Sequence, residues 1–328
     1  ISHYVEEKMK RSKNLLRKGA ALAAMSTVLV SQAPLINAFA YGEADVSQST
    51  FKQDTDNSAD FQNWLSNVWQ GGEKAYAQTE NVALTPGSDA ADLNFSWYSA
   101  GKGTPAVKVW KDGSKSSAKV VTGNAEAISA ENWQGKSYSA ANKVNIADYF
   151  EENTQYHYQY TDNYTGDDSI WSAEYDYTTK ATDKFSVILT GDPQVGASGS
   201  SSDYSANDAS VARDAYNWNK TMQQALKTCP DASFLLSAGD QINQSGATKD
   251  NDKKTRESEY AGYLYPSVFR SLPIAATIGN HDMAGSDYSA HFNNPNSEDK
   301  LGSTAAGSDF YFNYGDVLFI SLNSNNRN

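Results

Sequence analysis

Three short polar runs in the second half of the chain each follow an apolar segment of the kind that forms a buried strand. The runs are Gly-Asp-Pro-Gln at 191–194, Gly-Asp-Gln-Ile-Asn at 239–243 and Gly-Asn-His-Asp at 279–282, after the segments 185–190, 234–237 and 274–278. Ligands collect at the carboxyl ends of strands in open α/β sheets, and Asp and Asn oxygens suit hard cations. The pattern therefore predicts a metal site at one edge of a sheet.

The three runs, 40 to 50 residues apart, resemble in order the first motifs of the calcineurin-like metallophosphoesterases, and of the purple acid phosphatases among them. The resemblance implies a hydrolase of phosphoric esters with two metal ions, Fe, Mn or Zn. Asp192 would bind the first ion, Asp240 would bridge both, and Asn280 would bind the second. His281 would contact the phosphate and stabilise or protonate the leaving group, and Asp282 would orient its ring. Two such ions, about 4 Å apart, hold both the attacking and the leaving oxygen.

Two positions depart from the purple acid phosphatase pattern. That family has Gly where Gln194 stands and an iron-binding Tyr where Asn243 stands, and other superfamily members have a metal-binding His in place of Gln194. Gln194 either binds a metal ion weakly through its oxygen or hydrogen-bonds a metal-bound water. Without the Tyr the selection for ferric iron weakens, so the choice among Fe, Mn and Zn stays open.

The later histidine motifs of the family have no counterpart here. No His follows His291, and the sequence ends at Asn328 within a strand-like run at 317–322. The expectation is a catalytic domain, 185–328, of which only the N-terminal part is present, and a fragment that is inactive by itself. His291 lies where the family has structural and substrate-contacting residues, so we expect no metal ligand there.

The first 40 residues have the pattern of a bacterial secretory signal. A basic stretch follows Met9, an apolar stretch spans 20–30, and Ala-Phe-Ala at 38–40 forms a small-residue cleavage site. We therefore expect an untranslated leader at 1–8, a signal peptide at 9–40 and a protein that is secreted or held at the cell surface. The apolar run is shorter than the roughly 20 residues of a stable membrane span.

The composition agrees with an exported protein. The net charge of −12 argues against a nucleic-acid backbone as the partner, whereas the resemblance implies a small phosphorylated substrate. Cys229 stands alone, so no disulfide can form within the chain.

Residues 41–80 read as a polar leader with a short amphipathic helix over 60–74. Its apolar side chains fall on one stripe, which favours packing against the following domain over ligand binding; they are Phe61, Trp64, Leu65, Val68 and Trp69.

From 81 to 180 the hydrophobic period changes to two, which predicts an all-β sandwich of immunoglobulin type. The expected strands are 82–84, 93–98, 106–111, 119–122, 143–146, 155–161 and 172–178. Leu-Thr-Pro-Gly at 84–87, Trp97 and alternating tyrosines at 156–160 resemble the fibronectin-III-like N-terminal domain of purple acid phosphatases. Trp97 should lie in the core and the tyrosines should form one packed face, with a glycan platform as the alternative. His157 should face solvent.

Residues 185–328 alternate strands with helices at 208–227 and 256–265, which predicts an α/β sandwich, here the metallophosphoesterase domain. The Ser- and Gly-rich loop at 196–205 either covers substrate or is a flexible insertion. The predicted fold is thus two domains, a fibronectin-III-like sandwich followed by an incomplete α/β metallophosphoesterase sandwich.

The favoured function is a secreted, metal-dependent hydrolase of phosphate monoesters. One alternative is a phosphodiesterase acting on nucleotides or phospholipids. Another is a non-catalytic surface module that binds glycan and carries a decayed phosphoesterase half. The joint presence of Asp192, Asp240, Asn280 and His281 argues against decay.

Overall fold

The computed structural model describes residues 58–69, 82–133, 135–199, 207–246, 250–297 and 301–326. The expected leader at 1–8, the signal peptide at 9–40 and most of the 41–80 segment lie outside these ranges, as does part of the loop at 196–205. Within the described ranges, no helix has the length and apolarity needed to cross a bilayer.

The first described element is a short aromatic helix, α2 (Ala59–Trp64), which continues as the π-helical turn η1 (Leu65–Trp69). Ser58 caps it, because its Oγ accepts a hydrogen bond from the Phe61 N–H at 3.1 Å. The Trp64 ring lies 5.0 Å from Tyr216 and 5.5 Å from Tyr265, and its Nε1 donates to the Tyr265 hydroxyl. The aromatic stripe is packed within the protein, but the prediction of its partner is wrong, because Tyr216 and Tyr265 belong to the α/β half and not to the sandwich that follows in sequence.

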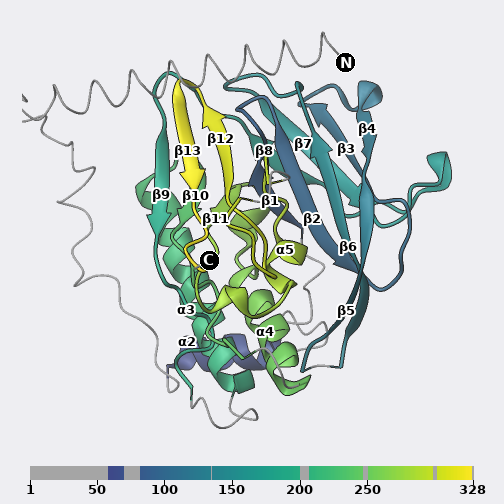
Figure 1. Ribbon diagram of the computed structural model, residues 1–328. Coiled ribbons are helices and arrows are strands. Elements are labelled where there is room, and N and C mark those ends of the chain that lie inside the picture. Colours follow the sequence, from purple (N-terminus) through teal and green to yellow (C-terminus); the bar gives the residue numbers. More distant parts are fainter. Residues whose placement is uncertain are drawn as a thin grey trace, which may run out of the picture. The chain divides into compact units, whose positions relative to one another are not determined.

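Residues 82–178 form two antiparallel sheets of four strands, ordered β1-β2-β6-β5 and β4-β3-β7-β8 (Figure 1). The first sheet consists of β1 (Ala83–Pro86), β2 (Leu93–Ser99), β5 (Asn124–Glu131) and β6 (Ser137–Ile146). The second consists of β3 (Ala106–Lys111), β4 (Lys119–Thr122), β7 (Gln155–Thr161) and β8 (Tyr175–Thr178). One apolar cluster takes residues from both sheets, so they pack as a sandwich.

The interior of the sandwich contains the aromatic residues expected there. Trp97 is buried, donates from Nε1 to Asp162 Oδ1 at 2.7 Å, and lies 4.9 Å from the Tyr160 ring. Tyr156 and Tyr158 are fully buried, and the Tyr158 hydroxyl donates to the carbonyl of Arg270. The tyrosine face is therefore packed inside the protein, and these buried rings do not form a platform for a glycan.

His157, expected to face solvent, is instead held between carboxylates. Its Nδ1 lies 2.7 Å from Asp176 Oδ1 and 3.5 Å from Glu174, its Nε2 lies 3.0 Å from Asp112 Oδ1, and only 14% of the side chain is exposed. Burial alone would lower the pKa of His157, but the hydrogen bonds to Asp112 and Asp176 outweigh it and raise the pKa above its usual value. Both ring nitrogens can donate only in the charged ring, which this arrangement favours.

The raised pKa of His157 should make its contribution to stability depend on pH. A group whose pKa is raised on folding stabilises the fold fully below its unfolded pKa, and the contribution disappears as pH rises through the folded value. We expect His157→Gln to lower the free energy of unfolding by up to about 1 kcal/mol at about pH 5. The loss should shrink towards about pH 9. Urea unfolding of both proteins measures it, and a loss that is equal at the two pH values would contradict the prediction.

The second half of the chain forms a three-stranded parallel sheet ordered β11-β10-β9. Its strands are β9 (Ser186–Thr190), β10 (Ala232–Ser237) and β11 (Ile274–Ala276). Helix α3 (Asn207–Thr228) connects the first two strands, and α4 (Asp250–Tyr263) with the turn η5 (Ser267–Arg270) connects the last two. The predicted βαβ alternation is confirmed, although α4 begins earlier than expected.

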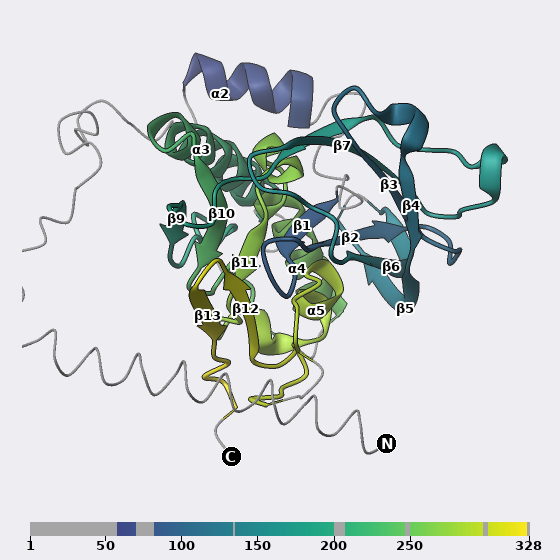
Figure 2. The ribbon, with the colours of Figure 1, turned by 90° about the horizontal axis from the view of Figure 1, so that it is seen from above.

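The two faces of this sheet are covered differently (Figure 2). Ile188, Leu235 and Ile274 share one core with the helices, whereas Phe234 and Ala275 pack against an antiparallel hairpin. That hairpin is β12 (Phe310–Tyr314) and β13 (Val317–Ser321). Between β11 and the hairpin lie the turn η6 (Asp282–Ala284) and the short helix α5 (Asp287–His291).

Hydrogen bonds join the sandwich to the α/β half. Thr85 Oγ1 donates to the Asn293 carbonyl at 2.7 Å, and the Asn293 amide donates to Asn145 Oδ1 at 2.6 Å. Arg270, buried beneath the sandwich, donates to the Val82 carbonyl at 2.8 Å. By their contacts, the described residues fall into one compact unit, so the division into two domains stays a prediction.

Candidate functional site

The loops that follow β9 and β10 run side by side at the carboxyl edge of the sheet. The Asp192 N–H donates to the Gly239 carbonyl at 3.3 Å, and the Gln194 N–H donates to the Asp240 carbonyl at 2.9 Å. These bonds extend the parallel pairing of the two strands beyond their ends. The sheet thus brings together the first two polar runs, as their positions in the sequence predict.

Three of the predicted metal ligands have an unusual backbone conformation. Asp192, Gln194 and Asp240 have φ angles of 54°, 36° and 51°, in the left-handed region that non-glycine residues rarely adopt. Such a conformation costs about 1 kcal/mol or more at each residue, and it persists where the surrounding structure enforces it, often at functional sites. The strain is concentrated in the two loops that carry the candidate ligands.

The third loop, after β11, touches the second because Gly279 has no side chain. A Cβ at Gly279 would lie 2.0 Å from both the backbone nitrogen and Oδ1 of Asp240. A Cβ at Gly239 would in turn lie 2.9 Å from the Gly279 Cα. The two motif glycines are therefore required for the close approach of the loops.

Asp240 connects all three loops. Its Oδ1 accepts a hydrogen bond from the His281 backbone N–H at 2.9 Å, and its Oδ2 accepts one from the Gln194 amide at 3.4 Å. Asp192 and Asn280 are exposed at the ends of their strands. Asp240 thus lies where the three loops meet, while its role as the carboxylate that bridges two metal ions stays a prediction.

The ring of His281 is oriented by a backbone carbonyl. Its Nδ1 contacts the carbonyl oxygen of Asn243. A carbonyl oxygen only accepts hydrogen bonds, so Nδ1 carries the proton and Nε2 is the nitrogen left for a substrate. The sequence singled out Asn243 only as the place of a missing Tyr, and nothing in the sequence pattern indicates a contact made by its main chain.

Asp282 does not orient the His281 ring, contrary to the expectation. Its buried carboxylate accepts hydrogen bonds from the Gly279 N–H at 2.9 Å, the Gln241 N–H at 3.4 Å and the Tyr260 hydroxyl at 2.9 Å. Burial raises the pKa of Asp282 to about 6, although these hydrogen bonds oppose the shift. Asp282 therefore joins the loops after β10 and β11 to α4, which is a structural role beneath the site.

His291 lies outside the site, as expected. It is 3% exposed, its Nε2 lies 3.0 Å from Glu257 Oε2, and its ring stacks on Tyr98 at 4.2 Å. Burial raises the pKa of Glu257, although the charge of His291 acts against the shift. His291 thus belongs to the interface between the sandwich and the α/β half.

The described residues do not by themselves fit a dinuclear metal centre. Within the described ranges, no group of three or more His, Cys, Asp or Glu side chains could hold a metal ion. The candidate ligands are the carboxylates of Asp192 and Asp240 and the amides of Gln194 and Asn280, which offer oxygen and no nitrogen. Zinc commonly takes four ligands and larger hard cations take about six or more, so four side chains are too few for two ions.

This donor set predicts weak metal binding by residues 1–328 alone. We expect calorimetric titration with Mn²⁺ or Zn²⁺ to show fewer than two ions per chain and no site of micromolar affinity, because ligand number and preorganisation set affinity. The double variant Asp192→Asn/Asp240→Asn provides the baseline for binding elsewhere. Two ions bound at micromolar affinity, and lost in that variant, would show that the described residues suffice.

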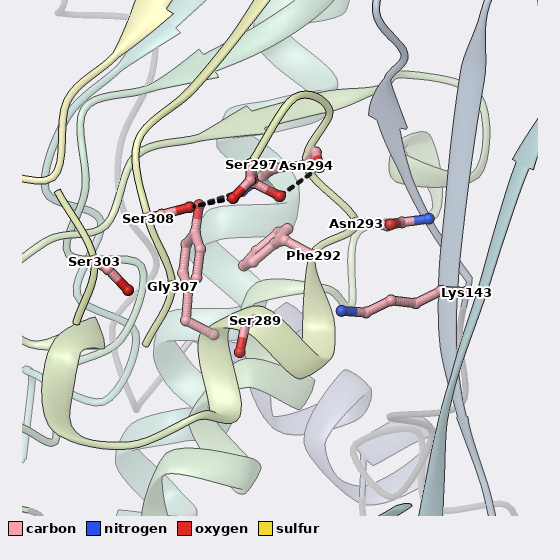
Figure 3. A pocket seen from close by; sticks show the side chains of 10 residues that line it. Lys143, Ser289, Phe292, Asn293, Asn294, Ser297, Ser303, Gly307 and Ser308 are labelled. Carbon is pink, nitrogen blue, oxygen red and sulfur yellow. Dashed lines mark hydrogen bonds between the residues drawn. The ribbon is translucent and has the colours of Figure 1, made fainter. Parts of the chain in front are cut away.

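A pocket of about 270 Å³ opens beside α5 and the segment that follows it (Figure 3). It is lined by Lys143, Tyr288, Ser289, Phe292, Asn293, Asn294, Ser297, Ser303, Gly307 and Ser308. Lys143 extends from β6 of the sandwich towards α5, and its Nζ pairs with Glu126 at 3.2 Å. None of the predicted site residues lines this hydroxyl-rich pocket.

Neither a family model nor a curated protein matches this sequence. Among solved structures, the fold is similar to that of a purple acid phosphatase. The structure is that of purple acid phosphatase PPD1 isolated from yellow lupin (Lupinus luteus) seeds, with 14% sequence identity and a TM-score of 0.51.

The similarity covers 73% of this chain but 43% of the lupin chain, so the chain spans less than half of that protein's length. Similarity at this identity shows the fold. The expected resemblance to purple acid phosphatases is thereby confirmed for the fold, whereas the fibronectin-III-like character of the sandwich stays a prediction.

Proposed function

We propose that the protein hydrolyses phosphoric esters, with small phosphate monoesters as its substrates. The observation that carries the proposal is the arrangement around Asp240. Its carboxylate contacts the loops of Gln194 and His281 at the carboxyl edge of a parallel sheet, and its backbone is strained. Strained, convergent polar loops at this edge are typical of ligand and catalytic sites.

In this proposal His281 acts on the phosphate. With its Nδ1–H donated to the Asn243 carbonyl, the charged ring carries a second proton on Nε2. That proton can be donated to a phosphate oxygen or to the leaving oxygen of the ester, which lowers the energy of the developing negative charge. A dinuclear centre of Fe, Mn or Zn is proposed for the whole protein, and it would need more ligands than the described residues supply.

Two observations bear on the alternatives. The buried Tyr156 and Tyr158 argue against a glycan-binding module built on the tyrosine face. The contacts of Asp240 with neighbouring loops argue against a decayed site, because a site without function has no reason to retain strained carboxylates. A phosphodiesterase would use the same site residues as a phosphomonoesterase, so only the substrate preference distinguishes the two activities.

The test compares an aryl phosphate with a bis(aryl) phosphate, using the protein expressed from its full gene and loaded with Mn²⁺, Zn²⁺ or Fe²⁺. We expect kcat/KM for the monoester to exceed that for the diester by more than about tenfold, a difference of about 1.4 kcal/mol in transition-state stabilisation. A preference for the diester would favour the phosphodiesterase. No turnover of either ester with any of the metals would refute the proposal.

A further inference from the structure

A buried carboxylate on α4 supports the loop that carries Asp240. Glu259 is 1% exposed, and its Oε2 accepts hydrogen bonds from the Asn243 N–H at 3.0 Å and the Gln244 N–H at 2.7 Å. Burial raises the pKa of Glu259 to about 8, and the two hydrogen bonds act against that shift. Burying a carboxylate destabilises the fold unless the carboxylate is hydrogen-bonded or paired with a charge. The position of Glu259 in the interior therefore needs a structural or functional reason.

The hydrogen bond to Gln244 connects Glu259 with the ring of His281. The Gln244 N–H and the Asn243 carbonyl belong to the same peptide unit, which is planar, so in a trans peptide they point in opposite directions. Glu259 holds the N–H, and the carbonyl on the other side contacts His281 Nδ1. Fixing one end of this peptide unit therefore fixes the direction of the other.

Glu259 also contacts the first loop. A Cβ at Gly196 would lie 2.3 Å from Glu259 Oε1, so this oxygen lies directly against the backbone that follows Gln194. The Asn243 N–H shares its hydrogen bond between Glu259 and the Val195 carbonyl at 3.2 Å. The Glu259 carboxylate thus packs between the loop after β9 and the loop after β10. Its contacts with both loops limit the movement of each.

We propose that Glu259 is a positioning residue for His281, which acts through the peptide unit between Asn243 and Gln244. It holds the ring in the tautomer with Nδ1 protonated, so that Nε2 is the nitrogen that takes up the proton donated to the phosphate. Asp282, the neighbour from which this role was expected, is engaged elsewhere. The inference rests on the proposed function for the use of His281, but the tautomer can be measured without turnover.

The test is the tautomeric state of His281 in the 328-residue chain, read from imidazole ¹⁵N shifts at about pH 9, where an ordinary His ring is neutral. The chain has four histidines, and His281→Gln assigns the signal. We expect wild type to show Nδ1–H, and Glu259→Leu, which removes the acceptor, to shift the population towards Nε2–H. Glu259→Gln keeps an acceptor oxygen and should retain the wild-type tautomer.

A matched control lies on α3. Asp214 Oδ2 accepts hydrogen bonds from the Gly196 N–H at 2.9 Å and the Ser198 N–H at 3.1 Å, which is the same kind of contact on a loop without His281. Asp214→Asn should leave the His281 tautomer unchanged. An equal shift in this variant would refute the specific path through Glu259. Unchanged signals of His157 and His291 report an intact fold.

If Glu259→Leu unfolds and the signals of His157 and His291 change, the second variant Glu259→Asp is used instead. It keeps the carboxylate but shortens the side chain by one methylene, so the carboxylate no longer reaches the Asn243 and Gln244 N–H groups. A wild-type tautomer in a folded Glu259→Leu or Glu259→Asp protein would overturn the inference. Where hydrolysis is measurable in the protein from the full gene, Glu259→Leu should lower kcat at least tenfold while KM changes little. A shifted tautomer without any phosphoesterase activity would uphold the positioning role and refute the proposed function.

Discussion

Replacing Asp240 by Asn should lower the hydrolysis of an aryl phosphate by more than about 100-fold in the protein expressed from its full gene. Loss of a supporting residue around a metal commonly costs 10- to 100-fold, and a central carboxylate should cost more. Asn has the same shape, and its oxygen can still accept the His281 N–H, so the contact between the second and third loops should remain. The hydrogen bond from the Gln194 amide has no acceptor left on the amide nitrogen of Asn. What is lost is half of the carboxylate charge that Asp192 and Asp240 offer to a cation.

The matched control is Asp92→Asn in the sandwich. Asp92 Oδ1 accepts a hydrogen bond from the Asp148 N–H at 2.8 Å, so the same change is made at another loop-holding carboxylate. The Asp92→Asn protein should hydrolyse the aryl phosphate at close to the wild-type rate. Initial rates at saturating metal are measured for both variants. A rate of Asp240→Asn within about tenfold of wild type would show that Asp240 is not part of the site.

Gly279→Ala should disrupt both the site and the fold around it. The new methyl group would lie 2.0 Å from the Asp240 nitrogen and Oδ1, so the second and third loops must separate. Overpacking of this kind costs about 1–3 kcal/mol of stability. Since the displaced atoms belong to Asp240, the rate of ester hydrolysis should fall together with the stability.

Gly191→Ala is the matched control, because it makes the same substitution in the first polar run. There the nearest neighbour of the added Cβ is the Ala238 Cβ at 3.9 Å, an ordinary contact, and the backbone is outside the left-handed region. Urea unfolding and initial rates should show this variant close to wild type. A Gly279→Ala protein that matched Gly191→Ala in both measurements would mean that the loops are not in close contact.

The positions of the candidate ligands were predictable from local patterns. Apolar segments before Asp192, Asp240 and Asn280 predicted strands, and the parallel order of β9, β10 and β11 followed from the helices between them. The prediction holds because a buried parallel strand needs a continuous apolar run and a polar residue marks its end.

Strand β5 shows where local patterns were insufficient. It was absent from the predicted strands because Asn-Ala-Glu-Ala-Ile-Ser-Ala-Glu contains small and helix-favouring residues with one β-branched side chain. Its pairing with β6 makes it a strand. The sequence did not indicate the burial of charged residues on α4 either. These residues are buried because they pair with residues far away in sequence, as Glu257 does with His291.

The sequence by itself determined which side chains reach the edge of the sheet, because strand periodicity and the residues at strand ends are local properties. Tertiary structure decided what holds those side chains in place. The contact of the Asn243 carbonyl with His281, the support of that peptide unit by Glu259 and the engagement of Asp282 by Tyr260 join separate loops and α4. Two of these contacts involve main-chain atoms, which are the same at every position and leave no mark in the sequence. The third joins the side chains of Tyr260 and Asp282, which lie 22 residues apart and meet only when the folded sheet brings α4 and the loops together.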